Sequence, residues 1–158
     1  LTARQAFVLE ARCLMRLQTL GEAARHFPAP VAFAPDDPSI TLSHVGWSLD
    51  SAEARALARR LRLPAQGYFE QIDSIVEGLE RASVVHLDLL QNARNVLLAE
   101  DGRLSLVDFD IAVIDDQPFS AEIQRRHDEW NAGGRFARTR RQLVRSVERF
   151  LDAADKGV

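Results

Sequence analysis

The stretch from residue 84 to residue 110 constrains the fold most, because polar side chains interrupt β-rich runs there. The runs "NVLL" (95–98) and "LSLVDFD" (104–110) flank Asp101-Gly102, and an Asp-Gly pair between apolar segments is a strong hairpin signal. A two-residue turn at these positions predicts that Asn95 faces Asp108 across the ladder. Directly opposed residues have Cβ atoms roughly 4.5–5.5 Å apart, so the hairpin register predicts an amide and a carboxylate side by side.

Three oxygen-bearing side chains are expected at the open end of this hairpin. Asp88 lies seven residues before Asn95, where it can point toward the same end as Asn95 and Asp108. Each residue alone is more simply explained as a turn or cap residue. Carboxylate and amide oxygens are, however, the ligands of hard cations such as Mg²⁺. The three together, in this order and register, favour a metal and phosphate site.

Helical patterns surround the hairpin. Apolar residues recur at helical spacing over 2–20, 51–63 and 68–82, with Thr2 and Ser51 as expected N-caps. The pattern of residues 120–158 predicts two helices divided by residues 131–134. One short strand is expected near 31–33, and another over 40–46 that runs into a turn at Gly46.

Composition excludes several classes of protein. The 158 residues are enough for one hydrophobic core, and the net charge of -3 argues against wholesale nucleic-acid binding. Cys13 is the single cysteine, so no internal disulfide can form and a reducing compartment is the default. No apolar run approaches the length of a membrane span. A cytoplasmic location without a transmembrane segment is therefore expected.

The segment resembles the catalytic part of the protein-kinase-like superfamily. "HLD" at 86–88 is similar to its H-x-D motif, "NVLL" to the asparagine that follows, and "VDFD" at 107–110 to its D-F-G metal motif. The resemblance implies that Asp88 accepts the proton of an attacking hydroxyl and that Asn95 and Asp108 hold Mg²⁺ on the phosphates of ATP. It implies a structural, bracing role for His86.

The resemblance extends upstream of these motifs. The 2–20 helix is similar to the small-lobe helix of this family, with Glu10 as its acidic residue, and Ser43, His44 and Val45 fall where the family contacts adenine. It implies an α+β, protein-kinase-like fold, with a small-lobe remnant in residues 1–50 and a mainly helical large lobe with the catalytic-loop hairpin in residues 51–158.

The chain departs from the family pattern at several positions. Asp88 and Asn95 are seven residues apart where the family has five, which indicates a two-residue insertion. Asp110 replaces the glycine of the metal motif, as in bacterial sugar and lipopolysaccharide-core kinases. No glycine-rich phosphate loop is present, and Lys156 is the single lysine. The chain begins at the small-lobe helix, so we expect a truncated piece or a degenerate relative, inactive or nearly so by itself.

Other interpretations also fit parts of the sequence. A scaffold or binding module of the pseudokinase type is the main alternative to a phosphotransferase. The "DFD" motif also resembles haloacid-dehalogenase phosphatases, which require a usable lysine after the motif, and the single lysine of the chain, Lys156, lies in the tail. Residues 125–149 carry eight arginines, which indicates either a solvated helix face or contact with an anionic partner. The acceptor is left open among a small molecule, a sugar and a protein hydroxyl.

Overall fold

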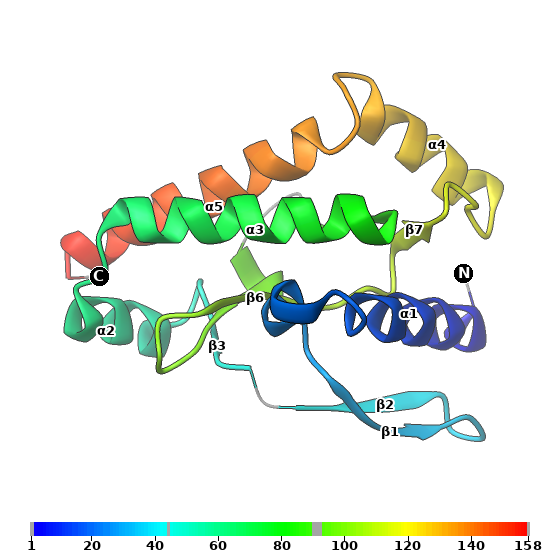
Figure 1. The fold of residues 1–158 in the computed structure, drawn as a ribbon, viewed down its shortest axis with the longest axis horizontal. Helices are drawn as coiled ribbons and strands as arrows, with labels where there is room; N and C mark the ends of the chain where they lie inside the picture. The colour runs from blue at the N-terminus through cyan, green and yellow to red at the C-terminus, as the bar shows by residue number, and fades with distance from the viewer. Residues whose placement is uncertain (1, 44, 90–92, 158) are drawn as a thin grey trace.

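The computed structural model describes residues 2–43, 45–89 and 93–157, and it has a mixed α and β fold (Figure 1). His44 lies outside the described residues. In chain order the elements are α1 (Ala3–Leu17), the 3-10 helix η1 (Gly21–His26), β1 (Pro30–Ala34), β2 (Ser39–Leu42), β3 (Trp47–Ser48), α2 (Ala52–Leu61), α3 (Ala65–Ala82), β4 (Val84–His86), the 3-10 helix η2 (Ala93–Asn95), β5 (Val96–Leu98), β6 (Leu104–Leu106), β7 (Ala112–Ile114), α4 (Ala121–Asn131) and α5 (Ala137–Asp155).

Side-chain caps fix where several helices begin. Thr2 accepts a hydrogen bond from the Gln5 backbone, and the Gln5 side chain accepts one from the Thr2 backbone, which forms a capping box. The Ser51 hydroxyl accepts from the Ala54 N–H at the start of α2. Both predicted caps are confirmed, although α1 ends at Leu17, three residues before the predicted end.

Helix α3 lies at the centre of the core. Its apolar stripe is buried, including Ile72, Ile75, Val76 and Leu79, and the helix packs against α5, α1 and β4. Figure 1 shows α3 running between α5 and α1. Within the described ranges, no helix is long and apolar enough to cross a membrane.

The strands form three small sheets. β3, β5 and β6 form a three-stranded sheet, while β1 pairs with β2 and β4 pairs with β7, all antiparallel. The β4–β7 pair was not predicted from the sequence. It joins the end of α3 to the segment that follows the "VDFD" motif, and so it positions the residues on both sides of the candidate site.

The predicted register of the β5–β6 hairpin is wrong by one residue. Leu97 pairs with Ser105, and the ladder continues to the bond from the Val107 N–H to the Asn95 carbonyl at 2.9 Å. The loop has three residues rather than two, and it closes through the Ala99 N–H on the Arg103 carbonyl. Gly102 takes a φ of 89°, as three-residue hairpin loops require of their last residue. Asn95 therefore opposes Val107, and the predicted cross-strand pair with Asp108 does not form.

The chain passes unusually close to β5 at Gly46. This residue has a φ of 127°, and a Cβ atom there would lie 2.2 Å from the Leu98 carbonyl oxygen. Only glycine fits both the backbone conformation and the space.

We therefore expect Gly46→Ala to lower the free energy of unfolding by about 3 kcal/mol or more, because backbone atoms must move to accept the methyl group. Chemical denaturation measures the loss. Gly133→Ala is the matched control, since the nearest atom to its Cβ is the end of the Arg141 side chain at 3.7 Å. Equal effects of the two substitutions would contradict this packing.

Candidate functional site

The carboxylates of Asp88, Asp108 and Asp110 lie close together, near the ends of β4, β6 and β7. Asp88 follows β4 by two residues, Asp108 follows β6 by two, and Asp110 precedes β7 by two. One oxygen of each lies within 4.8 Å of the others, and all three side chains are partly buried. Because β4 and β7 pair antiparallel, Asp88 and Asp110 leave the same end of that ladder. The grouping offers oxygen ligands to a hard cation.

Buried His86 connects the two loops that carry the acids. It is 0% exposed, and its Nδ1 accepts a hydrogen bond from the Asp88 N–H at 3.1 Å. Its Nε2 lies 2.9 Å from the Val107 carbonyl oxygen. Since the Asp88 N–H can only donate, the ring proton is on Nε2 and is donated to Val107. Burial lowers the pKa of His86, so the ring stays neutral and keeps this tautomer. The predicted bracing role thus has a structural basis.

Phe109 anchors the "VDFD" motif in the core. It is 0% exposed, with its ring 4.8 Å from that of His86 and 6.0 Å from that of Phe27. Asp108, just before it, has a φ of 67°, a left-handed conformation that aspartate tolerates better than most residues. With Phe109 turned inward, Asp108 and Asp110 on either side of it reach Asp88.

Asn95 contacts Asp88. Its Nδ2 donates to the Asp88 carbonyl oxygen at 2.8 Å and lies 3.4 Å from the carboxylate Oδ2. The side-chain amide therefore links η2 to Asp88 and restricts the position of Asp88. The sequence predicted this group near Asp88 and Asp108, but by a cross-strand pairing that the observed register replaces.

Asp110 is the member of the cluster that the sequence analysis did not include. Burial, a hydrogen bond with Asp108 and the charges of Asp108 and Asp88 raise its pKa from 3.8 to about 6. Its Oδ1 atom is buried without a hydrogen-bond partner among the described residues. The signal in the sequence was the Asp-Phe-Asp spacing, which sets a carboxyl on either side of an apolar residue.

Glu10 reaches the site from α1. Its carboxylate accepts a hydrogen bond from the Phe109 N–H at 3.3 Å. Burial raises its pKa, the bond from Phe109 opposes this, and the charge of Asp110 raises it further. Helix α1 is therefore connected to the acidic loop through the Glu10 carboxylate. The predicted nucleotide-side residue Glu10 lies beside the cluster.

Ser43 and Val45, the other described residues predicted to contact the nucleotide, are not part of the acidic cluster. Ser43 exchanges two hydrogen bonds of 3.0 Å with the Ala29 backbone, one through its N–H and one through its hydroxyl. Val45 lines a cavity of about 490 Å³ with Gly46, Trp47 and residues of the 99–103 loop. Within the described ranges, none of the three carboxylates lines this cavity.

Several arginines of the 125–149 segment have contacts inside the molecule. Arg126 donates to the Leu87 carbonyl at 3.0 Å, next to Asp88. Arg135 forms an ion pair with Asp116, the Arg138 guanidinium stacks over Trp130, and Arg140 pairs with Asp73. Part of the positive charge in this segment therefore stabilises the positions of α4 and α5.

Comparison with known proteins gives one relevant similarity. No protein-family model matches the chain. The chain is similar to the protein kinase PINOID of Oryza sativa subsp. japonica, with 28% identity over 169 aligned residues. The alignment covers 91% of this chain and 34% of PINOID, so the chain spans about a third of that relative's length. This similarity supports a kinase-like relationship for the chain only weakly.

The raised pKa of Asp110 predicts a pH-dependent stability. A carboxyl whose pKa is higher in the folded than in the unfolded state destabilises the fold above the folded pKa, and the cost disappears as the pH falls below the unfolded value. We expect Asp110→Asn to stabilise the protein by on the order of 1–3 kcal/mol at pH 8, with the gain shrinking through pH 6 toward pH 4.

Chemical denaturation across this pH range, without added divalent cations, measures the gain. Asp36→Asn, at an exposed position in the turn between β1 and β2, is the control and should change little. A gain for Asp110→Asn that does not vary with pH would contradict the electrostatic account.

Proposed function

We propose that this chain is a kinase-like phosphotransferase, which transfers a phosphoryl group from a nucleotide, ATP, to a hydroxyl acceptor. The observation that carries the proposal is the grouping of the Asp88, Asp108 and Asp110 carboxylates beside Asn95. The order of motifs along the chain and the similarity to a protein kinase support the same conclusion. Phosphoryl transfer depends mainly on positioning and on neutralising charge. A braced cluster of acids would position the acceptor hydroxyl and would hold the cation that neutralises the phosphate charge.

The residues of the cluster divide into two roles. Asp88 accepts the proton of the acceptor hydroxyl, with its carboxylate held by Asn95 and its backbone held by His86. Asp108, Asp110 and the amide oxygen of Asn95 are the candidate ligands of Mg²⁺. The fit is good, because these are oxygen donors and Asp110 has a buried oxygen without a partner among the described residues. Mg²⁺, when bound, supplies positive charge for the nucleotide phosphates.

The part of the proposed site that would bind the nucleotide has fewer of the expected residues than the acidic cluster. In this proposal residues 1–50 are a small-lobe remnant, with Glu10 near the phosphates and Ser43, His44 and Val45 near adenine, and residues 51–158 are the helical lobe. The single lysine, Lys156, follows α5, and the Glu10 carboxylate contacts the Phe109 backbone. The α- and β-phosphates therefore lack the usual lysine, and we propose that this chain by itself is inactive or turns over slowly.

A binding module without catalysis is the second candidate. The observation that favours it is that the single lysine of this chain, Lys156, follows α5 and lies outside the acidic cluster. An anionic partner at the 125–149 segment would fit such a module. If the chain is instead an active phosphotransferase, its acceptor is a small molecule, a sugar or a protein hydroxyl.

Nucleotide binding separates the two candidates. We expect isothermal titration to show ATP affinity that depends on Mg²⁺, and Asp108→Ala to weaken the Mg²⁺-dependent part by about tenfold or more, because a metal ligand is removed. Asp36→Ala is the control at an exposed turn. If ATP affinity changes neither with Mg²⁺ nor with Asp108→Ala, or if ATP does not bind at all, the result contradicts the phosphotransferase proposal and favours the binding module.

A further inference from the structure

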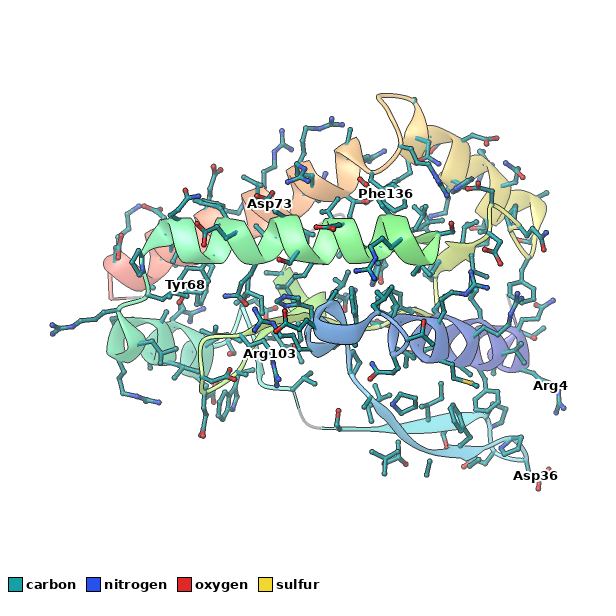
Figure 2. All side chains as sticks on the ribbon, in the orientation of Figure 1. Arg4, Asp36, Tyr68, Asp73, Arg103 and Phe136 are labelled. Atoms are coloured by element: carbon teal, nitrogen blue, oxygen red, sulfur yellow. The ribbon has the colours of Figure 1, made fainter. Side chains whose placement is uncertain are left out.

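A second cavity lies between α2, the start of α3 and the end of α5. It has a volume of about 330 Å³ and shares no lining residue with the acidic cluster. Figure 2 shows Tyr68 below the first turns of α3, on the side that faces α2. A cavity of this size matches pockets that hold small organic ligands.

Tyr68 provides a buried polar group in this cavity. Its side chain is 1% exposed, and its ring packs edge-on against Phe150 at 6.3 Å. The hydroxyl is buried and has no hydrogen-bond partner among the described residues. Burial raises the pKa of Tyr68, so the hydroxyl remains a donor. Buried hydroxyls are almost always paired, since leaving one unpaired is costly. The protonated hydroxyl can therefore donate to an acceptor in the cavity.

The charged residues of the cavity define what kind of acceptor fits. Arg59 and Arg62 line it together with Asp155. Arg59 is held there by a hydrogen bond from its Nη1 to the Ala154 carbonyl at 3.4 Å. Arg62 ends α2 in a left-handed conformation with a φ of 51°. Two guanidinium groups against one carboxylate leave a single positive charge, which matches a monoanion better than a dianionic phosphate.

The remaining lining is apolar, from Ala58, Leu63, Leu151 and Ala154. We propose that this cavity binds a small carboxylic acid with a short apolar body. Its carboxylate contacts the arginines and accepts from the Tyr68 hydroxyl, and its apolar body lies against the leucines and alanines. Arginine is well suited to this, because its planar fork matches a carboxylate. The site is independent of the phosphotransferase proposal.

The experiment uses the single tyrosine of the chain. In protein labelled only at tyrosine, all ring resonances come from Tyr68 and report directly on this cavity. Titration with pentanoate, followed by NMR, should shift the Tyr68 signal saturably, while inorganic phosphate at equal ionic strength should leave it unchanged.

Three variants test the contacts. Arg62→Gln should weaken pentanoate binding by about tenfold, because it removes a charged hydrogen-bond donor. Tyr68→Phe keeps the ring and should weaken binding as well, measured by calorimetry with circular dichroism to confirm folding. Arg60→Gln is the matched control, since Arg60 is exposed on the same helix and does not line the cavity. An unmoved Tyr68 signal, an equal response to phosphate, or equal losses in Arg60→Gln and Arg62→Gln would overturn the proposal.

Discussion

The candidate site depends on one buried side chain, His86. Its ring joins two segments that are far apart in sequence, through the Asp88 N–H on one side and the Val107 carbonyl on the other. Both bonds require a neutral ring with its proton on Nε2, and full burial favours that state. The ring also packs against Phe109, which fixes the turn between Asp108 and Asp110. The positions of the three acids therefore follow from a bond pattern inside the core.

Bringing these acids together has an energetic cost. The raised pKa of Asp110 shows that the folded protein holds this carboxyl where its charge is unfavourable. Asp108 has a left-handed backbone conformation in the same turn. Strain and like-charge repulsion of this kind are typical of functional sites, where a bound ligand compensates for them. A divalent cation is the simplest compensating ligand for three carboxylates, which connects the cost to the proposed function.

Local features of the fold could be predicted from the sequence, whereas long-range pairings could not. Thr2 and Ser51 marked helix starts because a capping hydroxyl acts on its immediate neighbours. The Asp-Gly pair correctly predicted a hairpin but not its register. A third loop residue shifts the pairing between β5 and β6 by one residue. β4 and β7 were missed, since each has three residues and they pair across more than twenty intervening positions.

For the site, the motif spacing predicted that Asp88, Asn95 and Asp108 lie together, and the structure places Asp88 and Asp108 in one cluster with Asn95 bonded to Asp88. Asp110 was overlooked because its position in the resembling family is a glycine. Its place beside Asp108 results from Phe109 turning into the core. That orientation depends on contacts with His86 and Phe27, which no local pattern reveals.

The central claim is that the acids braced by His86 form a cation site. A crystal structure of the protein grown with Mn²⁺, a metal that accepts the same oxygen ligands as Mg²⁺, tests it most directly by anomalous diffraction. The account predicts an anomalous peak between Asp108 and Asp110, on the side that faces Asp88. Fully occupied Mn²⁺ elsewhere, with these carboxylates left unliganded, would contradict it.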